Sequence, residues 1–416
     1  MRVLLAPHGT RGDVQPMLAL AHALAARAHQ VAFIAPTNFV AWIRAHGFDA
    51  ESNGIDVEAV LREPGADLQS MRWQRRHMND LIARLFESLG HYAGDADLIV
   101  GSGIQMAAPS IAEQRDIPYA NAVFCPCAVP SSATPPPPIR TQTLPRWVNR
   151  LLWDAGGPVT SFALRGLVNR GRARLGLRPI DDLLDSLAGD LVLVAADRDL
   201  GPLADDAPAR AVATDAWILA TGGTPPIDPS LEAFLALDPP PVYVGFGSMV
   251  AVRARRLAAH IAAAVRAIGR GLILAGGWAD LGGDLESGND LLIVREAPHA
   301  AVFPRVAAVI HHGGAGTTTA VAAAGVPQVV LPHILDQFYW AHRVAQLEIG
   351  PRGLPVELVT ADVLAERVDA AVSDQRYRRR AAELGHAIRP RNGVAAAVDH
   401  LERLASASLA ASGLAR

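Results

Sequence analysis

Apolar and polar positions alternate regularly along the first half of the chain. Short apolar runs at 2–6 and 31–35 flank a stretch in which Leu18, Ala21 and Leu24 recur at helical spacing. The same order of apolar run, amphipathic stretch and apolar run returns at 97–123. Short apolar runs of this kind predict buried strands, and the stretches between them predict helices. The pattern therefore predicts an α/β fold with a doubly wound parallel sheet.

A Pro/Gly-rich tract at 221–241 separates this pattern from a second one. The apolar runs at 191–194 and 217–219 are predicted as the last strands before the tract, and the alternation restarts at 242–246. Such changes of composition mark domain boundaries. The sequence thus predicts a first domain at 1–220, an interdomain linker at 221–241, a second domain at 242–392 and a terminal helix within 393–416.

The second pattern contains a glycine-rich turn between an apolar run and an Ala-rich helical stretch. The turn reads, in order, His311, His312, Gly313, Gly314, Ala315, Gly316 and Thr317. At a helix N-terminus these residues offer free backbone amides and a partial positive charge, which suit a diphosphate. An ordinary tight turn that needs glycines only for backbone freedom is the alternative. Asp336-Gln337 follows the next apolar run, where ligands of open α/β sheets bind.

Segment 312–317, Pro332 and the pair Asp336-Gln337 together resemble the donor-binding signature of family 1 glycosyltransferases. The likeness is greatest to the bacterial enzymes that decorate antibiotics, and it extends to the sterol glucosyltransferases and rhamnosyltransferases. It implies the GT-B fold, in which two Rossmann-like domains face each other across a cleft. The first domain would bind the acceptor, the second would bind the nucleotide sugar, and the terminal helix would cross back to the first.

The resemblance also implies a reaction. A hexose would move from a UDP- or dTDP-sugar to a hydroxyl of an apolar small molecule, such as a natural product, a lipid or a sterol-like compound, with inversion at the anomeric carbon. Two other classes use the same fold: a nucleotide-sugar 2-epimerase, which needs no acceptor, and a non-catalytic auxiliary protein of a partner glycosyltransferase. The acceptor pocket is expected, by resemblance, in the Pro-rich loop at 124–145 and the helical stretch at 147–175.

A loop at 7–15, ahead of a helix expected to start at Pro16, holds the candidate catalytic base. Residues 11–16 resemble the N-terminal loop of the antibiotic and sterol branches, which implies that Asp13 removes the acceptor's proton. A hydroxyl is a poor nucleophile near neutral pH, so a positioned proton acceptor lowers the barrier. A helix cap is the structural alternative for Asp13, and His8 is the alternative base.

The resemblance implies a donor site with contributions from both domains. The residues are Arg11, Gly247, Ser248, Ala297, His299, His312, Gly314, Gly316, Thr317, Asp336 and Gln337. Two positions depart from the plant enzymes: Glu296 replaces a tryptophan that stacks on the base, and Ala320 replaces a glutamate that holds the ribose. Trp278 becomes a candidate for stacking on the base, and both uridine and deoxythymidine donors stay open.

The amino-acid composition limits the kinds of binding partner that the protein is expected to have. The net charge of −3 makes neither a polyanion such as a nucleic acid nor an anionic membrane an obvious partner. The two cysteines, Cys125 and Cys127, fit a reducing cytoplasm, and no apolar run reaches the roughly 18–20 residues of a membrane span. Peripheral membrane contact is compatible with the sequence, and the oligomeric state is undetermined.

No metal or resident cofactor is expected, because the nucleotide sugar is a co-substrate. The D-x-D spacing of Asp197-Arg198-Asp199, which holds a metal in other glycosyltransferases, lies outside the expected donor site and is interpreted as a solvated turn.

Overall fold

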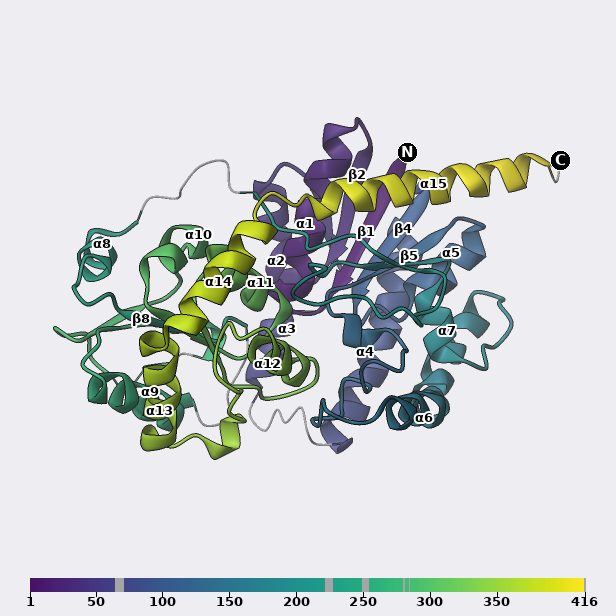
Figure 1. Cartoon of the computed structure of the whole chain (residues 1–416). Helices are drawn as coiled ribbons and strands as arrows, with labels where there is room; N and C mark the ends of the chain where they lie inside the picture. Colours follow the sequence, from purple (N-terminus) through teal and green to yellow (C-terminus); the bar gives the residue numbers. More distant parts are fainter. Residues whose placement is uncertain (64–70, 221–226, 249–253, 280, 284, 415–416) are drawn as a thin grey trace.

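The computed structural model describes residues 1–63, 71–220, 227–248, 254–279, 281–283 and 285–414. Two α/β domains are visible, each built on one sheet (Figure 1). The first sheet has seven strands in the order β3-β2-β1-β4-β5-β6-β7, and the second has five in the order β10-β9-β8-β11-β12. All neighbouring strands run parallel. The predicted doubly wound fold is therefore confirmed.

The first domain alternates strands and helices. Its strands are β1 (Arg2–His8), β2 (Gln30–Ala35), β3 (Asp49–Ser52), β4 (Leu98–Gly103), β5 (Tyr119–Val123), β6 (Leu191–Val194) and β7 (Ala211–Ala213). Its helices are α1 (Arg11–Ala26), α2 (Thr37–Ala45), α3 (Val57–Arg62), α4 (Met71–Tyr92), α5 (Ala108–Arg115), α6 (Arg146–Arg174) and α7 (Leu183–Ala188). Leu5, Met17 and Leu98 are fully buried between α1 and the sheet, so burial of these apolar side chains holds α1 in place.

The second domain repeats the scheme. Its strands are β8 (Val242–Gly245), β9 (Leu272–Ala275), β10 (Leu291–Val294), β11 (Ala308–His311) and β12 (Gln328–Val330). Its helices are α8 (Pro229–Leu235), α9 (Ala254–Ala267), α10 (His299–Val302), α11 (Ala315–Ala324), α12 (Gln337–Gln346), α13 (Ala361–Ser373) and α14 (Gln375–Ile388). The expected linker begins at 221–226, outside the described residues. Within its second half, α8 packs Phe234 against Tyr243 and Ile273 of the second sheet.

The last helix, α15 (Gly393–Leu414), lies along α1 of the first domain (Figure 1). Arg27, which follows α1, contacts the carboxylates of Asp399 at 2.5 Å and Glu402 at 3.0 Å. His29 also reaches Glu402, at 2.8 Å. The chain therefore returns to its first domain after completing the second.

The first helix starts earlier than predicted. It begins at Arg11, so Asp13 lies in the first turn and Pro16 lies inside the helix. Proline usually interrupts a helix because it lacks an N–H for the carbonyl four residues earlier. Here that carbonyl belongs to Gly12, at the start of the helix, where the loss of one bond is tolerated. The helix start at Pro16 was wrong because proline was taken as the first helical residue.

The apolar run at 217–219 is not a strand, and this prediction was wrong. The seventh strand is β7, and the chain leaves it at Asp215, whose φ of 61° is incompatible with a strand. Trp217 is nonetheless buried, and its indole N–H donates to Thr214 Oγ1 at 3.0 Å. The apolar residues at 217–219 therefore indicated a buried segment, and this segment is a loop and not a strand. The short strand β3 has a mostly polar sequence and was missed.

The segment 197–199 is not a solvated turn. Asp197 is 1% exposed, and Arg391, which follows α14, contacts its carboxylate at 2.6 Å. Arg391 also pairs with Asp199. A buried carboxylate requires such a partner, so these aspartates connect the two domains. In the described part of the chain, no helix is long and apolar enough to span a membrane.

Candidate active site

The glycine-rich turn leaves the N-terminus of α11 open. Gly314 precedes the helix without a capping side chain in the described structure, so the first amides have no intrahelical acceptor. Apart from the backbone of α11 itself, no atom of the described residues lies within 4 Å of the position where a Cβ would stand on Gly316. Thr317 is half-buried in the same first turn. Free amides beside open space form a site for an anion.

His312 lies over this turn. Its Nε2 is so close to Gly314 that a Cβ there would overlap the ring. Burial lowers the pKa of His312 to about 3, so the ring is neutral and one nitrogen carries the hydrogen. Its neighbour His311 points into the fold, where its Nε2 lies 2.9 Å from Gln328 Oε1 and its Nδ1 accepts from the Gly313 amide. Only His312 therefore faces the turn.

A second histidine, His333, packs beside His312. Both rings meet Phe246 edge-on, with centroids 5.5 Å and 6.4 Å away. The His333 Nδ1–H donates to the Leu331 carbonyl at 2.8 Å, so its Nε2 is left as an acceptor. Within the described residues, this Nε2 and the Nδ1 of His312 are buried without a partner. Such atoms are rare in native proteins and mark a place for a donor such as a hydroxyl or water.

Asp13 lies in the first turn of α1, beyond the carboxyl end of β1. Its Oδ2 accepts the Thr10 amide at 2.8 Å, so it does cap α1. Gly9 and Gly103 approach the carboxylate so closely that a Cβ on Gly9 would overlap it. Burial, with a further contribution from the charge of Asp336, raises the pKa of Asp13 to about 7, against the opposing hydrogen bond from Thr10. A carboxylate with this pKa can exchange a proton near neutral pH.

His8 is less suited to be a base. Asn53 Oδ1 accepts the Ile55 amide at 3.1 Å, which turns the Asn53 amide nitrogen toward His8 Nδ1, 3.0 Å away. This nitrogen therefore occupies the lone pair of Nδ1 and leaves Nε2 protonated. Burial lowers the pKa of His8 to about 4. The ring is thus a neutral hydrogen-bond donor held in the sheet, and Asp13 is the better proton acceptor.

Asp336 and Gln337 stand at the start of α12, across the cleft from Asp13. The Asp336 carboxylate makes no capping bond within the described chain, and burial raises its pKa to about 6. Gln337 Oε1 accepts the amides of His333 at 2.8 Å and Ile334 at 3.1 Å, which leaves its NH₂ group to donate. Asp336 therefore does not cap α12, and its carboxylate lies beside the amide group of Gln337.

Arg11 connects the two domains at the cleft. Its guanidinium lies 3.3 Å from the Glu296 carboxylate and 5.2 Å from the centre of the Trp42 ring. The side chains of Arg11 and Glu296 are 49% and 67% exposed, so the ion pair is weak, on the order of 0–1 kcal/mol. Arg11 can therefore exchange its ion pair with Glu296 for one with a phosphate at a small cost in free energy.

Gly247 is exposed and Ser248 is half-buried in a turn that lies close to Trp278. Gly247 has a φ of 55°, and its carbonyl accepts the Trp278 amide at 3.0 Å. The Trp278 ring stacks on Phe39 of the first domain, with centroids 6.0 Å apart and planes 29° apart. Trp278 thus stands where the two domains meet, beside the turn expected to hold a phosphate.

His299 and Ala297 follow β10. The His299 ring stacks on Phe303 with centroids 4.3 Å apart, and its Nε2 lies 3.4 Å from the Tyr243 hydroxyl. Ala297 is half-buried against the same apolar cluster. These contacts fix the loop at the carboxyl end of the sheet.

Comparison with known proteins identifies the chain. Residues 3–133 match the glycosyltransferase family 28 N-terminal domain, and residues 287–403 match the C-terminal domain of erythromycin biosynthesis protein CIII-like proteins. Vancomycin aglycone glucosyltransferase of Amycolatopsis orientalis is 39% identical over 84% of this chain and 85% of its own. The chain belongs to the antibiotic glycosyltransferases. Another relative in this family is dTDP-epi-vancosaminyltransferase of the same organism, 34% identical over 90% of this chain and 91% of its own.

A solved structure shows the same architecture. The spinosyn rhamnosyltransferase complexed with thymidine diphosphate superposes with a TM-score of 0.65, at 19% identity, over 97% of this chain and all of its own. The predicted GT-B fold is thereby confirmed. Like its relatives, the protein is a glycosyltransferase that takes a sugar from a nucleotide sugar.

Two residues of the glycosyltransferase site could not be identified from the sequence patterns. Asn53 sets the hydrogen-bonding state of His8, but it follows the strand β3 that the apolar pattern did not reveal. His333 lies inside the recognised segment between Pro332 and Asp336, yet nothing in the pattern gave it a role. Its significance comes from an unpartnered nitrogen, which only the packing shows.

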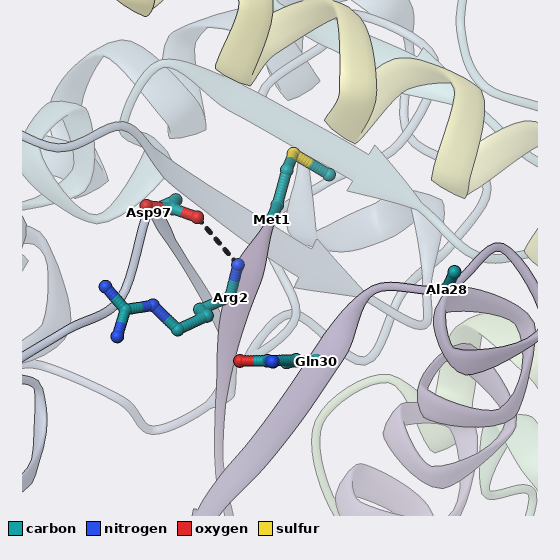
Figure 2. Close-up of a pocket in the computed structure, with 5 residues that line it drawn as sticks. All are labelled: Met1, Arg2, Ala28, Gln30 and Asp97. Carbon is teal, nitrogen blue, oxygen red and sulfur yellow. Dashed lines mark hydrogen bonds between the residues drawn. The ribbon is translucent and has the colours of Figure 1, made fainter.

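A hollow at the amino ends of strands in the first sheet is not the glycosyltransferase site. It is lined by Met1, Arg2, Ala28, Gln30 and Asp97 (Figure 2). Its one drawn interaction joins the Arg2 amide to Asp97 at 2.7 Å and ties β1 to the start of β4. These residues lie at the amino ends of the strands, whereas ligands of open α/β sheets bind at the carboxyl ends.

Proposed function

We propose that the protein is an inverting, metal-independent hexosyltransferase with Asp13 as its general base. The observation that carries the proposal is a proton-accepting carboxylate, with a pKa near 7, that faces a second domain bearing an uncapped helix N-terminus. In the reaction, Asp13 takes the acceptor's hydroxyl proton as the oxygen attacks the anomeric carbon. The bond from that carbon to the diphosphate oxygen breaks on the opposite face, so the configuration inverts.

The departing diphosphate gains negative charge, and the second domain is built to receive it. The free amides of α11, Thr317, Ser248 and the Nε2–H of His312 would donate to its oxygens. Arg11 would add a positive charge from the first domain. This set replaces the metal that other glycosyltransferases use, so full activity is expected without one.

The hexose and the nucleoside would occupy the flanks of this site. Asp336 and the NH₂ group of Gln337 would bind hexose hydroxyls, and Trp278 would stack on the base with Ala297 and His299 at its edge. Ala320 supplies no carboxylate for a ribose 2′-hydroxyl, so we favour a dTDP-sugar over a UDP-sugar. The names of the vancosaminyl relative and of the thymidine diphosphate complex support this choice.

The acceptor is proposed to be an apolar molecule that carries a hydroxyl. Two exposed apolar side chains stand next to the carboxylates: Ile104, 46% exposed, follows Gly103 beside Asp13, and Leu335, 49% exposed, precedes Asp336. Exposed apolar residues around a few polar groups are typical of small-molecule sites. We also propose the domain limits 1–220 and 242–392, with 221–241 as linker and 393–416 returning to the first domain.

A donor screen tests the proposal. The protein is incubated with dTDP- and UDP-hexoses, with and without a panel of apolar alcohols, phenols and free sugars, and products are detected by mass spectrometry. A β-linked product from an α-linked donor is expected, most rapidly from dTDP-sugars and apolar acceptors. Conversion of the donor alone to its 2-epimer would establish the epimerase alternative, and no conversion of any donor would support the auxiliary role.

A further inference from the structure

The loop at 124–145, which follows β5, touches both domains. At its start, Cys127 and Val129 are buried and belong to the same apolar cluster as Trp340 of α12. Separation of this part of the loop from the second domain would expose apolar surface to water, so it is costly. The start of the loop is therefore fixed between the two domains.

The middle of the loop is fastened to the first domain by two residues of α6. The Ser132 carbonyl accepts the side-chain amide of Asn149 at 3.0 Å. The Thr134 carbonyl accepts the indole N–H of Trp153 at 2.9 Å. Four successive prolines follow at 135–138, and they stiffen the chain because each ring fixes its own φ. The loop therefore carries the residues after the prolines, its tip, in a defined direction.

The tip of the loop meets the second domain through Arg140. Its guanidinium pairs with the carboxylate of Glu357, which lies in the short 3₁₀ helix η4 (Val356–Leu358). The same guanidinium lies 5.0 Å from the centre of the Phe338 ring, in the first turn of α12. Phe338 directly follows Gln337, one of the two residues proposed to bind the hexose. One side chain thus connects the loop to the helix that begins at the proposed hexose site.

The contact at the tip is weaker than the contact at the start of the loop. The side chains of Arg140 and Glu357 are 51% and 45% exposed, and exposed ion pairs break and re-form at little cost in free energy. Packing of the guanidinium on Phe338 adds a second weak attraction. The loop therefore has one end that stays in place and a tip that can be released.

Glu357, the partner of Arg140, lies close to the proposed donor site. Burial lowers the pKa of His333, and the negative charge of Glu357 opposes this effect. The amide of Val356 donates to the carbonyl of Pro332 at 3.2 Å, which holds η4 against the segment that leads to Asp336. Arg140 is thus joined to the border of the proposed hexose site and not to a remote surface.

We propose that Arg140 is a positioning residue that holds the loop at 124–145 against the donor domain during transfer. We call the pair Arg140–Glu357 the loop latch. With the loop latch formed, the tip of the loop stays beside Asp336-Gln337, so the first domain and the hexose site keep a fixed relation. With the loop latch broken, the tip can move away from the second domain. The effect on transfer rests on the proposed function, whereas the existence of the loop latch does not.

Direct binding of an anionic substrate is the alternative role for Arg140. A guanidinium recognises carboxylates by hydrogen bonds and stacks on aromatic rings. Arg140 finds both kinds of partner inside the protein, in Glu357 and Phe338. A role within the fold therefore accounts for the position of Arg140 without a ligand.

Limited proteolysis of the full-length protein tests the loop latch without donor or acceptor. Trypsin cleaves after Arg140 only when this side chain is free to enter the specificity pocket of the protease. Loss of the partner in Glu357→Gln should therefore speed cleavage of the Arg140–Thr141 bond roughly threefold or more. Glu232→Gln is the matched control, because Glu232 pairs with Arg305 at 2.8 Å inside the second domain. It should leave cleavage after Arg140 unchanged.

Steady-state kinetics test the effect on transfer, with the dTDP-hexose and the apolar acceptor that react fastest in the donor screen. In Arg140→Gln the KM for the acceptor should rise roughly 3- to 10-fold, because both contacts at the tip are lost. The dissociation constant of dTDP in calorimetry should stay unchanged, and Arg305→Gln should alter neither quantity. The double variant Arg140→Glu/Glu357→Arg should have a lower KM for the acceptor than Arg140→Glu, because it restores opposite charges.

Thermal melting should confirm that every variant is folded. Unchanged cleavage after Arg140 in Glu357→Gln would overturn the proposal, as would a double variant that is no better than Arg140→Glu. A raised KM in Arg140→Gln but not in Glu357→Gln would assign Arg140 to the acceptor itself and remove the loop latch from the reaction. If no donor is converted, the proposed transfer fails, and cleavage by trypsin still decides whether the loop latch exists.

Discussion

Replacement of Asp13 by asparagine separates its two roles. Asn keeps the shape of the side chain and an oxygen that can accept the Thr10 amide, now 2.8 Å from Asp13 Oδ2. It removes the proton affinity. If Asp13 is the base, turnover should fall by roughly 10²–10⁴-fold, the usual worth of general-base catalysis. If Asp13 only caps α1, Asn should serve as well and activity should survive.

Although Asp13→Asn should lower turnover, it should raise the stability of the folded protein near neutral pH. The pKa of Asp13 rises from 3.8 to about 7 in the folded protein, so folding disfavours the charged carboxylate. The wild type should therefore lose stability as the pH rises from about 4 to 7, by at most about 4 kcal/mol at 1.4 kcal/mol per pKa unit. Solvent that reaches the half-buried side chain reduces this bound. Asp13→Asn should match the wild type at low pH and be more stable at pH 8.

The assay combines turnover, melting and a pH profile. Wild-type kcat/KM should rise with pH to a midpoint near 7, the pKa of Asp13, and the variant should lack this rise. Asp56→Asn is the matched control, because Asp56 Oδ1 caps α3 by accepting the Ala59 amide at 2.9 Å, away from the site. Near-wild-type turnover in Asp13→Asn would refute the reasoning, and a large loss in His8→Ala instead would assign the base to His8.

Two further predictions concern the donor side. Gly316→Leu should fold normally, because no described atom outside the α11 backbone lies within 4 Å of the new Cβ. It should bind dTDP roughly 10-fold or more weakly in calorimetry, because the leucine side chain displaces the diphosphate from its hydrogen bonds. Gly166→Leu, equally open on α6, is its control, and equal affinity in both would remove the diphosphate from α11. Activity should persist in excess chelator, and loss that magnesium or manganese restores would contradict metal independence.

Local patterns predicted the parts of the structure that are set locally. Mostly apolar runs such as 2–6 and 31–35 are strands because a parallel sheet covered on both faces admits apolar side chains on both faces of a strand. The glycine turn at 313–316 was recognised because its order of strand, turn and helix lies within one short segment. Errors arose where burial and strand formation differ: Trp217 is apolar and buried, yet the loop around it turns at Asp215.

The rest of the site depends on contacts between distant segments. Arg11 meets Glu296 and Trp278 meets Phe39 across the cleft, and neither pair is close in sequence. Asp197 was taken as solvated because its partner Arg391 is 194 residues away. The hydrogen-bonding states of His8 and His333 follow from single bonds to Asn53 and Leu331, which no residue pattern encodes.

The raised pKa of Asp13 reflects competing effects. The main effect that lowers this pKa is the hydrogen bond from the nearby Thr10 amide. The hydrogen bond from Thr10 and the helix N-terminus favour the carboxylate, whereas burial has the largest effect and raises the pKa of Asp13 to about 7. The charge of Asp336 in the other domain adds to burial, so proton affinity depends on a closed cleft. Asp336→Asn should therefore move the midpoint of kcat/KM below pH 7, apart from any loss of hexose affinity. An unmoved midpoint would show that Asp13 titrates independently of the second domain.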